Sequence, residues 1–172
     1  PICHGQLQLT FVTNDPNKYN AGDRFIAPFP HPPGQHVAQA APDFAFGRIG
    51  YDTNFIGALS YPCRYDMVTS VEKHEGLHYF IHYPTTLDWA DQSTSFHHMT
   101  DEAKKQEARN LFVQKMKQSW TSLCPRGMGS SSIRFFETLC MGRIPVHISD
   151  AYILPRYENI AYDDFCLFIS ED

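Results

Sequence analysis

The sequence predicts an α/β fold, in which helices flank a Rossmann-like, open and mostly parallel sheet. Two observations support this prediction. From residue 52 onward, short apolar runs of strand length alternate with stretches of helical periodicity, and this alternation is typical of parallel sheets. A chain of 172 residues with 42% hydrophobic content can bury one sizeable core, so we expect a single compact domain rather than two.

The first 50 residues are predicted to form a loop-rich segment with short strands. Pro, Asn, Gly and Gln accumulate in "NDPNKYNAGD" and "PFPHPPGQH", and these residues favour turns and loops. Short strands are expected only at 7–12 and 23–29. Residues 51–172 are expected to form the Rossmann-like domain.

Within that domain, the element boundaries follow from turn and capping signals. Gly76 and Gly142 are placed to end two helices, proline closes the strand that reaches residue 84, and Thr100 and Asp101 resemble a helix start. The expected strands are 53–61, 77–84, 120–125, 144–149 and 164–170, and the expected helices are 64–76, 101–119 and one that ends at Cys140.

Charge and cysteine content exclude several classes of protein. The formal net charge of -5 gives no broad basic field, which argues against nucleic acid or anionic membranes as main partners. The five cysteines are odd in number and contain no CxxC pair, which argues against a disulfide framework and a zinc knuckle. Any anion-binding site must therefore be local.

The stretch "CPRGMGSSSIRFF" at residues 124–136 is the strongest candidate for such a site. In an open α/β sheet, ligands bind beyond the carboxyl ends of strands, where loops enter the next helix, and this stretch lies at such a place. Its glycines permit close backbone approach, its serines can cap the helix, and its arginine can grip phosphate with paired hydrogen bonds. The residues concerned are Arg126, Gly127, Gly129, Ser130 and Ser131. The alternative is an ordinary serine-capped turn that binds nothing.

The helix after this loop is predicted to carry an exposed polar edge. On a helical wheel, Arg134 and Glu137 share a stripe with Ser130 and Met141, opposite a mainly apolar side. A carboxylate two turns down the helix, about 10 Å from its start, could bond ribose hydroxyls while the loop holds a diphosphate. The alternative is that Arg134 and Glu137 form only a surface ion pair.

Histidines offer weaker candidates. His82 and His147 lie near the expected carboxyl ends of strands, and each is either a general base or a hydrogen-bonded structural side chain. The adjacent pair His97 and His98 lacks a third ligand at standard spacing, so no metal site is expected.

The stretch "LCPRGMGSSSIRFFETLCMGRIPVHISD", followed by "LP" at 154–155 and "DDFCLFISED", resembles the donor half of exostosin-like glycosyltransferases, glycosyltransferase family 47. The family pattern runs approximately CPRGxGxxSxRFFEAlxxGCIPVvISD. Upstream, "NFIGALSYPCRYDMVTSV" is similar to the family's F-x-G segment with its arginine and helix. The resemblance is strongest over residues 123–150.

This resemblance implies a GT-B enzyme of polysaccharide biosynthesis that transfers a sugar with inversion. The donor would be a nucleotide-sugar, UDP-linked, and the acceptor a glycan or glycolipid, with no divalent metal and no other cofactor. The chain is long enough for one GT-B half only, so a second domain or partner is expected to complete the acceptor site. The alternative is a non-catalytic module that binds nucleotide-sugar or carbohydrate.

The resemblance also assigns residues to roles. Arg126 would face the diphosphate in the turn lined by Gly127, Gly129, Ser130 and Ser131, and Arg64 would reach the same phosphates. Arg134 and Glu137 match the family's arginine and glutamate, with Glu137 the candidate for ribose. Asp150 would border the sugar, and together with His82 it is the candidate catalytic residue. The sequence departs from the family around Met141 and Arg143 and after Leu154.

Localisation is predicted from the same features. The free thiols and the absence of an apolar span or glycosylation signal favour a cytoplasmic chain that is at most peripheral to a membrane. The Golgi lumen, where the family's relatives reside, is the alternative for a trimmed chain.

Overall fold

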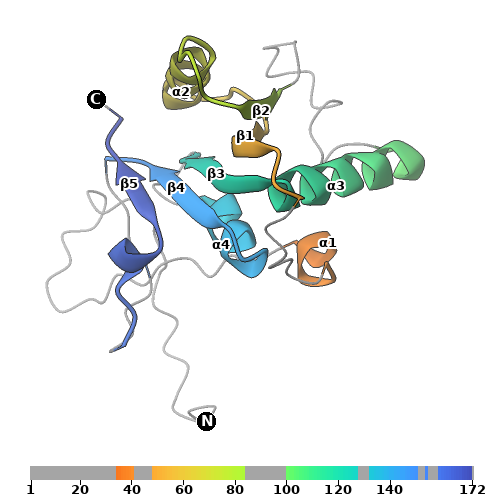
Figure 1. The fold of residues 1–172 in the computed structure, drawn as a ribbon. Coiled ribbons are helices and arrows are strands. Elements are labelled where there is room, and N and C mark those ends of the chain that lie inside the picture. Colours follow the sequence, from red (N-terminus) through yellow and green to blue (C-terminus); the bar gives the residue numbers. More distant parts are fainter. Residues whose placement is uncertain are drawn as a thin grey trace, which may run out of the picture.

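The computed structural model describes residues 34–40, 48–83, 100–127, 132–150, 154 and 159–171. It contains a five-stranded, fully parallel sheet with helices packed on it (Figure 1), which confirms the predicted α/β class. In chain order the elements are α1 (Gln35–Ala38), β1 (Tyr51–Ile56), α2 (Pro62–Glu72), β2 (Tyr79–His82), α3 (Glu102–Lys117), β3 (Ser119–Pro125), α4 (Ile133–Cys140), β4 (Ile144–Ile148), the 3-10 helix η3 (Tyr162–Asp164) and β5 (Leu167–Ile169).

The strand order is β2-β1-β3-β4-β5. The chain therefore runs outward from β1 to β2, returns to β3 on the other side of β1, and continues in that direction to β5. Register pairs Ile56 with His82, and it aligns Pro125, Ile148 and Ile169 at the ends of the last three strands. All the carboxyl ends thus lie along one edge, and the order of the strands reverses between β1 and β3.

A buried amide fixes the register at this reversal. Asn54 in β1 is only 1% exposed, and its Nδ2 donates to Ser122 Oγ at 2.8 Å and to the Thr121 carbonyl at 3.0 Å in β3. A buried polar group is costly unless it is hydrogen-bonded. A shifted register would leave this amide without its partners, so Asn54 helps to specify how β1 and β3 pair.

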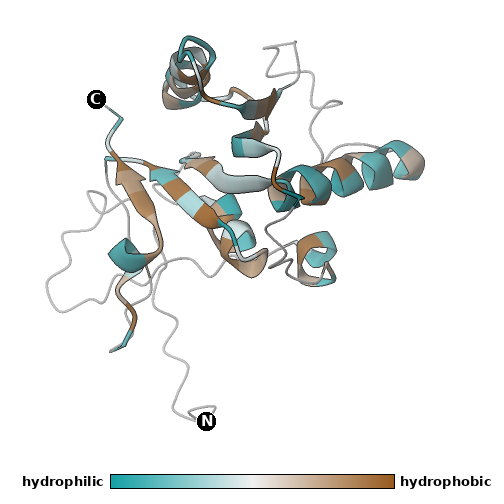
Figure 2. Cartoon of the chain, viewed as in Figure 1, coloured by the Kyte–Doolittle hydropathy of each residue, from teal (hydrophilic) through white to brown (hydrophobic). Residues whose placement is uncertain are grey.

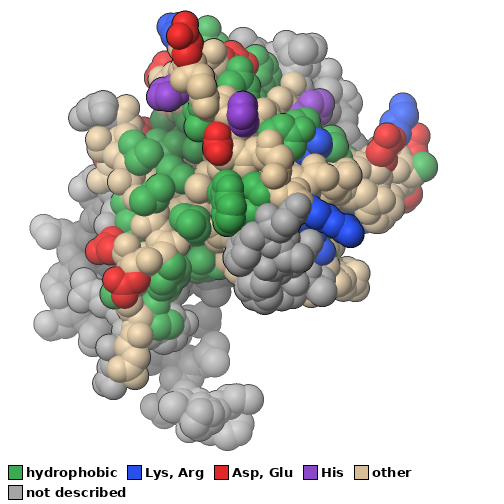
Figure 3. All heavy atoms as spheres, viewed as in Figure 1, with side chains coloured by type: hydrophobic (Ala, Val, Ile, Leu, Met, Phe, Trp, Pro, Cys, Tyr) green, Lys and Arg blue, Asp and Glu red, His purple; other side chains and the backbone are tan. Residues whose placement is uncertain are grey.

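Two cores lie on opposite faces of the sheet. On one face, Met67 and Val68 of α2 pack against Phe55, Leu123, Val146 and Ile148 of the strands. On the other face, Phe135 of α4 packs with Cys124, Cys166 and Phe168. Figure 2 shows a mainly apolar β5, a near-neutral β3 and, on α3, hydrophilic residues that alternate with apolar ones. Charged side chains lie mainly at the periphery of the face seen in Figure 3.

Local signals explain where the helices begin and end. Asp101 Oδ1 caps α3 by accepting from the backbone N–H groups of Ala103 and Lys104 at 3.0 and 3.2 Å. Gly142 follows α4 with φ +66°, and the next N–H bonds back to the Thr138 carbonyl at 3.1 Å, a terminus that favours glycine. None of the helices in the described ranges is long and apolar enough to cross a membrane.

The structure corrects several predicted boundaries. The helix expected at 64–76 runs from Pro62 to Glu72 and so ends before Gly76, and the strand expected at 164–170 begins at Leu167, after a 3-10 helix. The strand expected at 53–61 ends at Ile56, because Pro62 opens α2 directly after a short turn. The short helix α1 was not predicted, and it packs against α3 and α4 through Val37, Met116 and Met141. The strands expected at 7–12 and 23–29 lie outside the described residues.

Candidate functional site

The loops that leave β1 and β3 diverge to opposite faces of the sheet. The loop after β1 leads into α2 on one face, and the loop after β3 leads into α4 on the other. In doubly wound sheets, ligands bind at this reversal of strand order, beyond the carboxyl ends of the strands. The candidate "CPRGMGSSSIRFF" stretch spans the second of these loops, as the sequence predicted.

Arg64 and Arg126 meet at this point, although 62 positions separate them in the chain. Arg64 Nε donates to the Arg126 carbonyl at 3.0 Å, and its Nη1 donates to the Ala58 carbonyl at 3.0 Å. Its Nη2 lies 3.5 Å from the position that a Cβ atom on Gly127 would take. Burial lowers the pKa of the Arg64 guanidinium. The fold therefore brings Arg64, Arg126 and Gly127 together.

Arg126 is paired with a carboxylate that the sequence prediction missed. Its Nε donates to Oε1 of Glu171, and this hydrogen bond raises the pKa of Arg126. The Glu171 N–H donates in turn to Asp150 Oδ1 at 2.7 Å, which places Asp150 at the same edge. The sequence did contain a signal for Glu171, because "SED" follows the last strand directly. The carboxyl end of every parallel strand reaches this edge of the sheet, so an acidic residue there was a candidate partner for Arg126.

Arg134 is enclosed, which contradicts the predicted exposed edge. Its guanidinium carbon lies 4.6 Å from the centroid of the Phe55 ring and 5.3 Å from that of Phe112, and Nη2 donates to the Ile56 carbonyl at the end of β1. Burial lowers its pKa to about 10. Nη1 is buried and has no hydrogen-bond partner in the part of the chain that the structure describes.

Glu137 is buried rather than exposed. The residue is 8% exposed, and its Oε1 accepts from the Gly34 N–H at 3.1 Å. The helical wheel failed here because α1 covers this side of α4, where Met141 is fully buried. The outward residues are instead Ile133 and Cys140. Since Arg134 and Glu137 bond different backbone groups, the alternative of a mutual surface ion pair is wrong too.

The N-terminus of α4 differs slightly from the prediction. The N-cap is Ser132, rather than Ser130 or Ser131, because the helix begins at Ile133. The Ser132 side chain makes no capping hydrogen bond, so the N-cap residue leaves the first N–H groups of α4 without a side-chain cap of its own. Gly129, Ser130 and Ser131 lie outside the described residues.

The histidine candidates are not brought to this site. His82 ends the outer strand β2, with β1 between it and β3, which separates it from β3 by two strand spacings, about 10 Å. His147 is 2% exposed, lies between the rings of Phe135 and Phe168, and has Nδ1 3.2 Å from the Cys124 carbonyl. That environment matches the structural alternative for His147. His97 and His98 lie outside the described residues.

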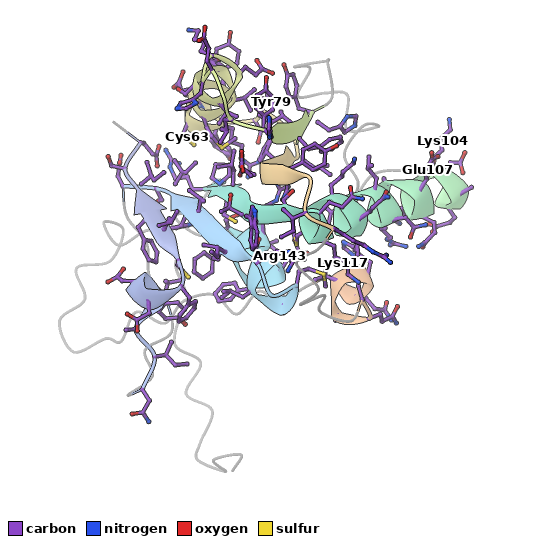
Figure 4. The ribbon with its side chains drawn as sticks, in the orientation of Figure 1. Cys63, Tyr79, Lys104, Glu107, Lys117 and Arg143 are labelled. Atoms are coloured by element: carbon purple, nitrogen blue, oxygen red, sulfur yellow. The ribbon has the colours of Figure 1, made fainter. Side chains whose placement is uncertain are left out.

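Arg143, one of the departures from the family pattern, lies at the opposite edge of the sheet. It precedes β4 and is 4% exposed, and Nη2 donates to the Lys117 carbonyl at the end of α3 at 2.7 Å (Figure 4). Cys63, by contrast, lies on α2 beside the candidate site, and burial raises the pKa of its thiol. Within the described ranges, no three His, Cys, Asp or Glu side chains gather in a group that could hold a metal ion.

Comparison with known proteins agrees with this description. The Exostosin GT47 domain family matches residues 5–172. A 49-residue stretch is 45% identical to the exostosin-1 homolog of Caenorhabditis elegans, covering 28% of this chain and 13% of that protein. A 61-residue stretch is 36% and 33% identical to two probable glucuronosyltransferases of Oryza sativa subsp. japonica, covering 36% of this chain. The matches span 13% to 15% of these relatives' own length.

Proposed function

The chain belongs to the Exostosin GT47 domain family, and from that premise we propose that it binds the diphosphate of a nucleotide-sugar donor in a glycosyl-transfer reaction. One observation carries the proposal. Arg64 Nε donates to the backbone carbonyl of Arg126, a residue distant in sequence, where the strand order reverses, and doubly wound sheets bind ligands at this position.

The chemistry of the donor explains why cations are needed there. A leaving nucleoside diphosphate gains negative charge as the sugar departs, and groups aimed at that charge lower the barrier. Among the described residues, Arg126 and Arg64 keep guanidinium N–H groups without a hydrogen-bond partner, and the first turn of α4, which Ser132 does not cap, adds backbone donors. We propose that these groups act without a divalent metal, with inversion, on a UDP-linked donor.

Arg134 and Glu137 of α4 take supporting roles in this proposal. The guanidinium of Arg134 brings a third positive charge to the end of β1, where it adds to the potential felt by an anion. Glu137 uses Oε1 to accept from the Gly34 N–H, and a carboxylate keeps further acceptor sites on its second oxygen. We propose that Glu137 bonds a ribose hydroxyl through these sites while it keeps the contact with Gly34.

The residues described so far concern the donor, and the candidates for the acceptor site are Asp150 and His82. Asp150 follows β4 beside Glu171 and Arg126, while His82 is two strands away from β3, so we propose that Asp150, rather than His82, borders the sugar. We propose that a second domain or partner supplies the remainder of the acceptor site and acts on a glycan or glycolipid. The cytoplasmic location stays a prediction.

Titration calorimetry with UDP tests the donor proposal. Arg126→Ala is expected to weaken UDP binding about tenfold or more, because a charged hydrogen bond is lost. Glu137→Ala is expected to weaken it less, whereas Lys104→Ala, on the exposed face of α3, serves as the charge-matched control and should bind as the parent does. Folded Arg126→Ala and Glu137→Ala variants that both bind like the parent would contradict the site.

A turnover assay separates the enzyme from the binding-module alternative. UDP release from UDP-sugar in the presence of a glycan acceptor supports transfer, and release should fall with Arg126→Ala. Binding of UDP without release for any acceptor tested, in the full-length protein, supports the non-catalytic module instead.

A further inference from the structure

Glu171 joins the ends of three strands. It lies two residues beyond β5, its Oε1 accepts from Arg126 Nε after β3, and its backbone N–H donates to Asp150 Oδ1 after β4 at 2.7 Å. The Asp150 N–H approaches the same Glu171 Oε1 at 3.4 Å. The carboxylate therefore crosses β4 to reach an arginine that the proposed function assigns to the donor phosphates.

The relative exposure of the two side chains shows how the pair is arranged. The Glu171 side chain is 14% exposed, whereas that of Arg126 is 31% exposed. A carboxylate in the place of a phosphate would be expected to be the more exposed partner, whereas Glu171 is the less exposed one. Glu171 occupies the Nε edge of Arg126, which leaves the Nη edge for a ligand.

The hydrogen bonds of Arg126 lead to the same arrangement. A guanidinium has five N–H groups; one donates to Glu171 and one, from Nη1, donates to the Gly127 carbonyl at 3.2 Å. Three N–H groups (5 − 2) therefore have no hydrogen-bond partner among the described residues. The backbone of Arg126 is held as well, because its N–H donates to the Ile148 carbonyl at 3.0 Å and its carbonyl accepts from Arg64.

We propose that Glu171 is a positioning residue, which holds the guanidinium of Arg126 by its Nε edge and so presents the Nη edge to the diphosphate of the donor. This inference rests on the proposed function. Arginine loses much rotameric freedom when it binds a ligand, and a partner that has already fixed the side chain removes part of that entropic cost. Glu171 itself touches no ligand in this arrangement.

The Glu171 carboxylate also repels phosphate, because both are negatively charged. This repulsion weakens donor binding, whereas the positioning of Arg126 strengthens it. The repulsion is weakened because Arg126 stands between Glu171 and the ligand and because the edge of the sheet is partly hydrated. We expect the gain from positioning to exceed it while Arg126 is present. Without Arg126, only the repulsion remains, so removal of Glu171 should no longer weaken binding.

A double-mutant cycle measures both effects. Titration calorimetry with inorganic pyrophosphate and with UDP is carried out on the parent, Glu171→Ala, Arg126→Ala and the double variant. Glu171→Ala is expected to raise Kd about threefold to tenfold in the parent background and to leave Kd unchanged or lower in the Arg126→Ala background. Glu171→Gln, which keeps an acceptor oxygen, is expected to restore part of the loss.

Two controls separate positioning from general damage to the fold. Glu102→Ala and Glu102→Gln remove an exposed carboxylate that pairs with Lys105 on α3 and should leave both Kd values unchanged. Thermal unfolding of each variant verifies that the sheet is intact, and Glu171→Gln carries the test if Glu171→Ala does not fold.

The outcomes distinguish the two proposals. If the parent binds pyrophosphate and UDP, and Arg126→Ala weakens both, the donor site stands. A Glu171 variant that then binds as well as the parent, or more tightly, overturns the positioning role, as does an equal loss in the Arg126→Ala background. A parent that binds neither probe overturns the donor site and the positioning role together.

Discussion

Arg126 and Arg134 reach the same edge of the sheet and have opposite environments. Arg126 lies directly after β3. Its side chain is partly exposed and donates a hydrogen bond to the Glu171 carboxylate, and this bond raises the pKa of Arg126. Arg134 lies in the first turn of α4, where its guanidinium packs against two phenylalanine rings and donates to a backbone carbonyl. Burial lowers the pKa of Arg134 to about 10. The first side chain is open to a ligand, while the second is enclosed by the fold.

The difference follows from what surrounds each arginine. A loop at the end of a parallel strand has solvent beyond it, so a guanidinium there can pair on one side and remain free on the other. Many side chains of a helix that packs on a sheet face neighbouring elements. The Arg134 side chain accordingly packs against the rings of Phe55 and Phe112. Two arginines eight positions apart thus divide between ligand contact and internal support.

The largest effect on the free energy of unfolding is expected from the removal of the Phe135 ring, which packs α4 onto the sheet. Phe135 is 1% exposed and contacts the rings of Phe136, His147, Tyr162 and Phe168. Phe135→Ala should lower the free energy of unfolding by about 3 to 5 kcal/mol, because it leaves a cavity in this core. Urea unfolding checks the value.

The matched control for that prediction is on the same helix. Ile133 is 42% exposed, so Ile133→Ala should change the free energy of unfolding by less than about 1 kcal/mol. Similar losses in both variants would show that α4 does not pack as described, and the enclosed environment of Arg134 would then have no basis.

An intermediate effect is expected when the two arginines receive the same substitution. Arg134→Ala should lower the free energy of unfolding by about 2 kcal/mol, because packing between the rings of Phe55 and Phe112 is lost, partly offset by relief of the buried charge. Arg126→Ala removes a partly exposed ion pair and should cost less than about 1 kcal/mol. Equal costs for the two variants would remove the distinction between them.

The last effect is absent at neutral pH and concerns Cys124, which lies two residues before Arg126 but is fully buried. Burial raises the pKa of its thiol to about 12, against 9.0 for a free thiol. Above pH 9 the unfolded chain releases this proton while the folded chain keeps it, so stability falls as pH rises from 9 towards 12, by at most about 1.4 kcal/mol per pH unit. Unfolding measured between pH 8 and 10.5 should show a shallower fall in Cys124→Ala than in the parent.

The fold could largely be predicted from the sequence. The five strands of the domain were expected at nearly their observed places, because apolar runs such as "WTSLCP" and "IPVHIS" must be buried between helices. The order of the strands could not be predicted, since periodicity carries no information about which strands pair. The placement of α1 against α4 depends on tertiary contacts through Val37 and Met141, which no local pattern reveals.

The candidate site also contains residues that could be predicted from the sequence and residues that could not. Arg126 and Gly127 could be located because a loop that follows a parallel strand always reaches the carboxyl edge, and the family resemblance placed Arg64 beside them. The exposure of Arg134 and Glu137 was predicted wrongly, because a helical wheel shows which residues share a face and not what covers that face. Glu171 was missed because its role depends on a partner 45 positions away.

The most direct test of the donor site is a crystal structure of the chain with UDP bound. We expect diphosphate oxygens about 2.7 to 3.2 Å from Nη atoms of Arg126, with Glu171 still on the Nε edge and Arg64 close by. A diphosphate bound away from both arginines, with the contacts of Arg126 unchanged, would show that the donor site lies elsewhere.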